Sequence, residues 1–109
     1  MRLPHADTAI VPLAKITHYL LSDDHPDGRG KAEFFKRFGF RSEEPHVLEA
    51  ALIRLARDTD MTESTTGFGL KYVGSGPLPC PDGRQPLVVT VWMLRAGLPP
   101  PYLVTAYPA

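Results

Sequence analysis

Three side chains suited to acid–base and phosphate chemistry lie close together between Asp23 and Lys31. His25 changes charge near neutral pH, and Arg29 and Lys31 can pair with phosphate or carboxylate groups. Glycines between them let backbone N–H groups come close to a ligand. The stretch is the first candidate for a functional site, although its composition is also typical of a solvated connection between two helices.

These residue types favour acid–base chemistry without a metal ion or a cofactor. His25 can move protons, while Arg29, Lys31 or Lys71 can stabilise negative charge. The combination suits cleavage of an RNA phosphodiester, because the ribose 2′-hydroxyl is an internal nucleophile. Such a reaction needs only a base, an acid for the leaving oxygen and cations around the phosphate.

Other kinds of site lack the residue patterns that they need. The stretch Gly67–Tyr72 only superficially resembles a phosphate-binding loop, because its sixth residue is not glycine and no Gly-Lys-Ser/Thr follows. The four histidines include no pair at metal-ligand spacing on one helix, which leaves His25 with its neighbouring aspartates as the remaining metal candidate. Cys80 has no basic neighbour nearer than Arg84 to activate it, and the sequence contains no Gly-x-Ser-x-Gly motif.

The elements that must position these residues change in type along the chain. Apolar spacing and turn residues predict helices at about 12–21, 29–38 and 42–58, the second ending at Gly39 and the third containing Pro45. Alternating and apolar runs predict strands at about 66–75, 87–94 and 102–107, with a short extra strand near 9–11. We therefore expect an α+β fold, with about three N-terminal helices packed on a C-terminal antiparallel sheet of three or four strands.

Two strongly apolar regions are assigned to the core. The phenylalanines of the second helix have the spacing of a buried helical face, and Trp92 lies in the strand that we expect to be central.

Composition describes an ordinary globular chain. The 109 residues are 43% hydrophobic and 22% charged, and we expect one domain spanning 1–109. Twelve basic residues balance twelve acidic ones, so any attraction for nucleic acid must be local. The single cysteine, Cys80, is compatible with a reducing compartment, and no signal peptide or membrane span is indicated, so we expect a cytoplasmic protein.

Several motifs resemble those of a small bacterial domain family of unknown function. They are the His-Pro-x-Gly-x-x-Lys-Ala motif at 25–32, the glycine turn at 83, and the stretches 69–72, 91–93 and 103–108. The start of the chain, at 1–4 and 9–11, resembles the stand-alone members of this family, which are small proteins often encoded beside a second small protein in a toxin–antitoxin-like pair. Other members resemble the C-terminal tips of large polymorphic toxins. The resemblance implies a small effector with a cognate antitoxin or immunity protein as its partner. A looser likeness, to ribonuclease toxins of the barnase, EndoU, colicin and RelE-like group, implies RNA as the substrate.

The ribonuclease likeness implies a role for each candidate residue. His25 would be the general acid or base, Lys31 would neutralise the phosphate with help from Arg29, and Thr105 would donate a hydrogen bond to it. Tyr72 or Tyr107 would stack on a base or supply a proton, beside Lys71. Each residue also has a purely structural alternative: a loop cap for His25, a solvated first-turn residue for Lys31, β propensity for Thr105 and core edges for the tyrosines.

The sequence is also compatible with two further functions. The first is a non-catalytic protein-interaction module that uses the proline-rich loop at 99–101 and a sheet edge. The second is binding of RNA or DNA without catalysis, which the zero net charge disfavours.

Overall fold

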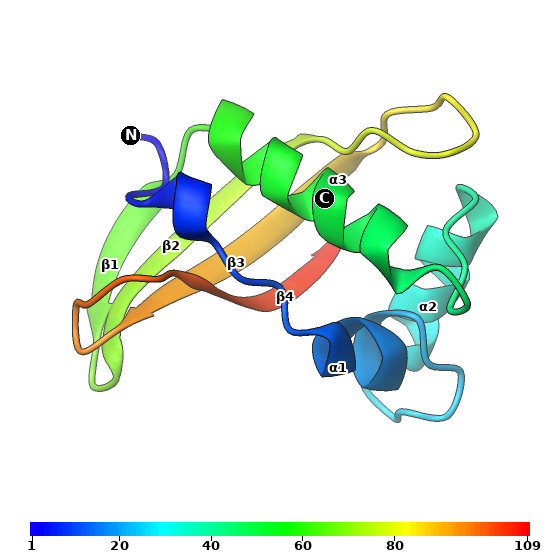
Figure 1. Ribbon diagram of the computed structural model, residues 1–109, viewed down its shortest axis with the longest axis horizontal. Coiled ribbons are helices and arrows are strands. Elements are labelled where there is room, and N and C mark those ends of the chain that lie inside the picture. The colour runs from blue at the N-terminus through cyan, green and yellow to red at the C-terminus, as the bar shows by residue number, and fades with distance from the viewer.

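The computed structural model describes residues 1–109 and places helical segments before a four-stranded antiparallel sheet (Figure 1). The α+β prediction is therefore confirmed. The helical segments are η1 (Ala6–Thr8), α1 (Leu13–Lys15), η2 (Ile16–Leu20), α2 (Arg29–Arg37) and α3 (Pro45–Asp58). The strands are β1 (Thr62–Thr66), β2 (Gly69–Pro77), β3 (Leu87–Arg95) and β4 (Tyr102–Pro108).

The first predicted helix is present but is not a regular α-helix. One α-helical turn, α1, continues into the π-helix η2, in which the Leu21 N–H donates to the Ile16 carbonyl oxygen at 2.8 Å. Ile16 and Leu20 are fully buried, so the wider winding keeps both apolar residues on the core side. Short π-helical turns are frequent at functional sites.

Helix α2 ends where the glycine signal predicts. Gly39 has a φ of 102°, a conformation that a side chain disfavours, and the Phe40 N–H donates to the Phe35 carbonyl oxygen at 3.2 Å. Phe35 and Phe40 are both buried and their rings lie 6.2 Å apart. The predicted core role of the helix phenylalanines is therefore confirmed for Phe35, whereas Phe34 and Phe38 are only partly buried.

Helix α3 lies across one face of the sheet and buries one stripe of its surface. It begins at Pro45, whose ring suits the first helical turn, rather than at Ser42. The buried stripe consists of Leu48, Ala51, Leu52, Leu55 and Ala56.

The sheet has the order β1-β2-β3-β4, and β3 is central as predicted. The prediction of the additional strand was wrong in its location. The fourth strand is β1, which forms a two-residue hairpin with β2, whereas the segment near 9–11 contributes a single bridge between Ile10 and Tyr102. The polar composition of β1, Thr-Glu-Ser-Thr-Thr, explains why the apolar pattern did not reveal it.

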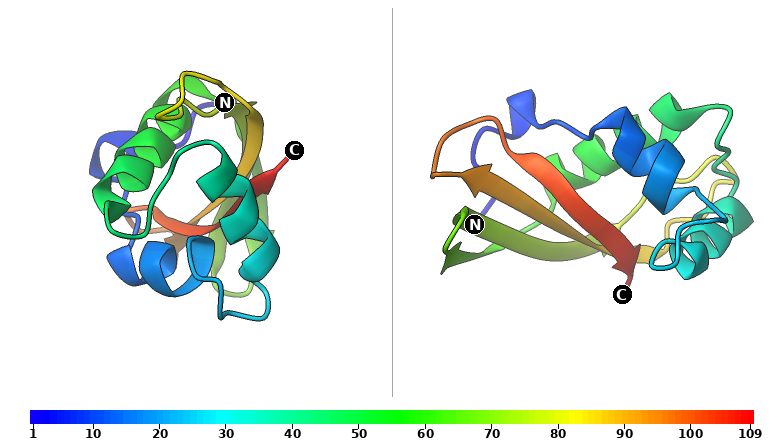
Figure 2. Two further views of the ribbon diagram at one scale, coloured as in Figure 1. Left: turned by 90° about the vertical axis from the view of Figure 1, so that its right-hand side faces the viewer. Right: turned by 90° about the horizontal axis from the view of Figure 1, so that it is seen from below.

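The two faces of the sheet differ in what covers them. Trp92, Tyr72 and Leu103 face the helices within a core cluster of 20 buried residues, which confirms the core role of Trp92. The opposite face, which we call the outer face, carries no helix across its centre (Figure 2). No helix is long and apolar enough to cross a membrane.

A β-bulge in β4 decides which residues reach the outer face. Trp92 pairs with Leu103 but Val91 pairs with Thr105, so Val104 is the extra residue. Leu103 and Thr105 would share a face in a regular strand, because side chains alternate with a period of two. The bulge instead places Leu103 in the core and Thr105 on the outer face, and such bulges commonly re-aim a side chain beside a functional site.

Candidate active site

The loop between η2 and α2 is held against η2 at Gly28. This glycine is buried, and a Cβ atom there would collide with the carbonyl oxygen of Tyr19. A second contact is made at the start of the loop, where Asp23 forms an ion pair with Lys36 of α2 at 2.9 Å. The loop that carries His25 is therefore fixed at both ends.

His25 caps this loop through one of its two ring nitrogens. Its Nδ1 atom accepts hydrogen bonds from the backbone N–H groups of Asp27 at 3.0 Å and Gly28 at 3.2 Å. Because both partners are donors, Nδ1 must present a lone pair, and the neutral ring carries its proton on Nε2. His25 is therefore oriented to donate a hydrogen bond through Nε2.

Tyr19 is the residue around which the predicted site residues meet. Its hydroxyl lies 3.1 Å from Thr105 Oγ1, and the His25 ring packs edge-on against its ring at 4.9 Å between centroids. The Nζ atoms of Lys31 and Lys15 lie 5.1 Å and 5.3 Å from the centre of the same ring. We call these five residues the Tyr19 cluster.

The electrostatics of the cluster make Tyr19 easier to ionise than an ordinary tyrosine. Partial burial of the ring opposes ionisation and is the largest single influence. The hydrogen bonds to Thr105 and Lys31 and the charges of Lys31 and Lys15 together outweigh it, and they lower the pKa of Tyr19 below its ordinary value. Anionic groups of a ligand would meet two ammonium groups here.

Three further predicted residues lie outside this cluster. Tyr107 follows Thr105 by two positions on the outer face and is 38% exposed. Arg29 is exposed at the first position of α2, two residues before Lys31. Lys71 also faces outward, but its strand β2 lies two strand spacings from β4, roughly 10 Å across the sheet.

Tyr72 is placed in the core and is not part of the cluster. It is 1% exposed, and its hydroxyl donates to Glu63 Oε2 at 2.6 Å. Burial, the hydrogen bond and the charge of Glu63 raise the pKa of Tyr72 to about 12. This environment matches the structural alternative for Tyr72 and does not support contact with a substrate.

Sequence reasoning missed Tyr19 and Lys15. The signal that could have revealed them is their spacing of four residues, which puts both on one side of the predicted first helix, away from the apolar stripe of Leu13, Ile16 and Leu20. Thr105 follows Tyr19 by 86 positions. Sequence spacing alone does not reveal such a pair.

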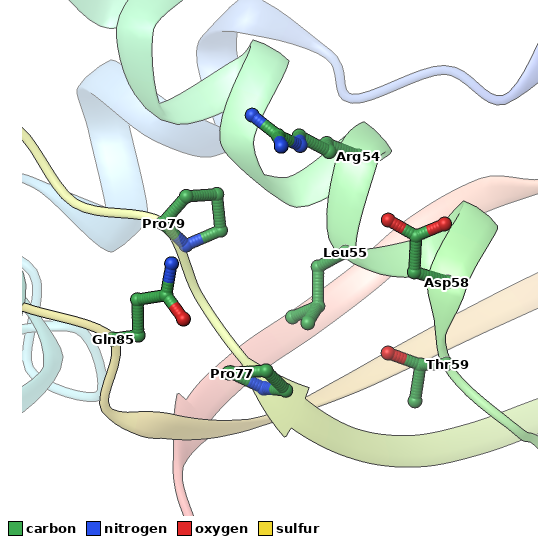
Figure 3. A pocket seen from close by; sticks show the side chains of 7 residues that line it. All are labelled: Arg54, Leu55, Asp58, Thr59, Pro77, Pro79 and Gln85. Atoms are coloured by element: carbon green, nitrogen blue, oxygen red, sulfur yellow. The ribbon is translucent and has the colours of Figure 1, made fainter.

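Two other features, a pocket and the single cysteine, share no residue with the Tyr19 cluster. A pocket of about 240 Å³ lies between α3 and the connection from β2 to β3 (Figure 3). It is lined by Arg54, Leu55, Asp58, Thr59, Pro77, Pro79 and Gln85, none of which is a predicted site residue.

Cys80 is half-buried, and burial with the nearby Asp82 charge raises the pKa of its thiol to about 11, so the reactive thiolate is disfavoured. No group of three or more His, Cys, Asp or Glu side chains is arranged to hold a metal ion.

The molecule is thus an α+β protein whose polar cluster joins its first helical segment, the following loop and the last strand. The chain belongs to the DUF6883 family, a domain of unknown function whose model matches residues 2–109. The predicted membership of a domain family of unknown function is confirmed at this level.

Comparison with solved structures shows the same fold in a second protein. One chain of a contact-dependent growth inhibition toxin–immunity protein complex from Klebsiella pneumoniae 342 matches with a TM-score of 0.71. The match covers 97% of each chain at 15% sequence identity, which establishes similarity of fold. No curated protein matches the chain.

Proposed function

We propose that this protein is a toxin-like, metal-independent ribonuclease whose active site is the Tyr19 cluster. The observation that carries the proposal is the meeting of His25, Lys31 and Thr105 around one phenol ring, although they come from a loop, a helix and the last strand. Hydrogen-bond donors and cations at one place suit a phosphate that gains negative charge as it is attacked.

The four residues around Tyr19 each have a role in this proposal. Lys31 neutralises the scissile phosphate, and His25 donates to a phosphate oxygen through Nε2. Thr105 and Lys15 complete the set of donors, while Arg29, Tyr107 and Lys71 contact neighbouring nucleotides.

The likeness to a chain of a toxin–immunity complex supports the toxin part of the proposal. We propose accordingly that a small cognate immunity or antitoxin protein binds this chain and blocks its activity. Co-expression of that protein would then restore growth of cells that produce the chain.

The test combines growth with RNA cleavage. The wild-type chain, induced without a partner, should stop growth, and the purified protein should cleave RNA in the presence of EDTA. Removing one donor to a developing charge typically costs about 10²–10³-fold in rate. We expect His25→Ala and Lys31→Met to lose activity on this scale.

His46→Ala provides the matched control, because His46 is an exposed histidine of α3 outside the cluster. It should cleave like the wild type. Intact RNA with the wild-type protein would overturn the proposed function, whereas full activity of both cluster variants would overturn the proposed site.

One observation favours a second candidate, a non-catalytic module for protein binding. Strand β1 is an edge of the sheet and pairs only with β2, so its other side is free to receive a strand from a partner. A protein of this kind would leave RNA intact in the same assay.

A further inference from the structure

We propose that Tyr19 is the catalytic acid of the cluster and gives its hydroxyl proton to the 5′-oxygen that leaves during RNA cleavage. This inference rests on the proposed function and adds a catalytic residue to it. It also assigns the proton transfer to a residue other than His25.

The position of the Tyr19 hydroxyl suits this role. Thr105 lies on the outer face because of the bulge at Val104, and the Tyr19 hydroxyl reaches that face to contact Thr105 Oγ1 at 3.1 Å. Tyr19 is half-buried, and its ring is held by the π-helix behind it and by His25 beside it. A phosphate that meets Lys31 would therefore place its leaving oxygen near a fixed phenol.

The charged neighbours suit a proton donor. A phenol that gives up its proton becomes a phenolate, and the ammonium groups of Lys31 and Lys15 stabilise that anion. The lowered pKa of Tyr19 has the same cause, after the opposing effect of burial.

His25 is less suited to proton transfer than Tyr19. The lone pair on Nδ1 is held by two backbone N–H groups, and the neutral ring has no second lone pair with which to act as a base. As a neutral donor, His25 can orient the phosphate while it keeps its own proton.

The reaction balances as follows. The 2′-hydroxyl loses its proton to water, the 2′-oxygen forms a bond to phosphorus, and the bond from phosphorus to the 5′-oxygen breaks. The 5′-oxygen takes the proton of Tyr19, and water then reprotonates the phenolate. The products are a 2′,3′-cyclic phosphate and a free 5′-hydroxyl.

The first experiment uses a leaving group that needs no proton. Tyr19→Phe should cleave ordinary RNA about 10²–10⁴-fold more slowly than the wild type, the range typical of a lost acid or base. On RNA with a 5′-bridging sulfur in place of the leaving oxygen, the same variant should approach the wild-type rate, because a thiolate leaves without protonation. Tyr102→Phe is the matched control, since that ring packs on Arg95 outside the cluster.

The outcomes separate the two proposals. If RNA stays intact with the wild type and with every variant, the ribonuclease function is overturned, and the role of Tyr19 with it. Cleavage by the wild type with an unchanged Tyr19→Phe rate, or an equal loss on the oxygen and sulfur substrates, overturns the role of Tyr19 alone.

The second experiment needs no substrate. With ¹³C at Cζ of each tyrosine, NMR titration should show Tyr19 ionising at a lower pH than tyrosine in an unstructured peptide, and Lys31→Met should move its midpoint upward. A Tyr19 midpoint at or above that of the unstructured peptide would overturn the proposal. Melting temperatures establish that each variant is folded.

Discussion

Tyr19 and Tyr72 show how one residue type is directed to opposite chemistry by its neighbours. Two lysines and a threonine stabilise the phenolate of Tyr19, whereas burial and the carboxylate of Glu63 stabilise the phenol of Tyr72. The first environment suits proton transfer and the second suits a permanent hydrogen bond within the fold.

Ionisation of Tyr72 should lower the free energy of unfolding at high pH. Its pKa is about 12 in the folded protein against an ordinary value of 10.0, so the folded state keeps a proton that the unfolded chain loses. This stabilisation is complete below pH 10 and is lost as the pH rises towards 12, by up to roughly 1.4 kcal/mol per pH unit.

Urea denaturation between pH 8 and pH 11.5 measures this effect. Tyr72→Phe should lose this component of the decline, while Tyr107→Phe, which changes an exposed ring, should keep it. An equal decline in the wild type and in Tyr72→Phe would contradict the assignment to Tyr72.

At the scale of single elements, the short irregular pieces do more to build the cluster than the long regular ones. The π-helix presents Tyr19, the bulge at Val104 turns Thr105 outward, and the loop that packs at Gly28 holds His25. Helix α3 and strand β3 supply the core on which these pieces rest.

Two glycines at the start of α2 should respond in opposite ways to alanine. At Gly28 the new Cβ collides with the Tyr19 carbonyl oxygen, so Gly28→Ala should displace the loop and lower the melting temperature. At Gly30 nothing lies within 4 Å of the new atom, and alanine in a helix should stabilise the protein by up to about 1 kcal/mol.

Thermal denaturation of the two variants provides the measurement. If the loop is displaced, NMR titration of Gly28→Ala should no longer show the lowered ionisation midpoint of Tyr19. A Gly28→Ala variant as stable as the wild type would show that the loop does not depend on this contact.

At the scale of the whole molecule, the charges balance while the cluster gathers cations locally. The chain carries twelve basic and twelve acidic residues, but only basic side chains lie over the Tyr19 ring. Two ammonium groups therefore lie together although the net charge of the chain is zero, and such a local concentration of charge can attract an anion.

We expect the chain to unfold as one domain. Trp92 is buried in a core cluster that includes residues of η2, α2, α3 and all strands except β1, so loosening of one layer exposes the other. In urea, the fluorescence of Trp92 and the far-ultraviolet circular dichroism should change with the same midpoint. Separate midpoints would indicate two units that unfold independently.

Features that depend on neighbours along the chain could be predicted from the order of the amino acids alone. The apolar stripe of α3, the glycine stop at Gly39 and the long apolar run of β3 were predicted because helix and strand periods are local. His25 and Lys31 were selected because they lie six positions apart in a stretch that already had the right composition.

Which of those residues meet depends on how the whole chain packs in three dimensions. β1 lacked an apolar pattern and became a strand because β2 pairs with it, and the extra residue Val104 can be recognised only against β3. The contact between Tyr19 and Thr105 depends on both the π-helix and that bulge. It brings together residues 86 positions apart, and such a contact is set by packing of the whole chain rather than by any local preference.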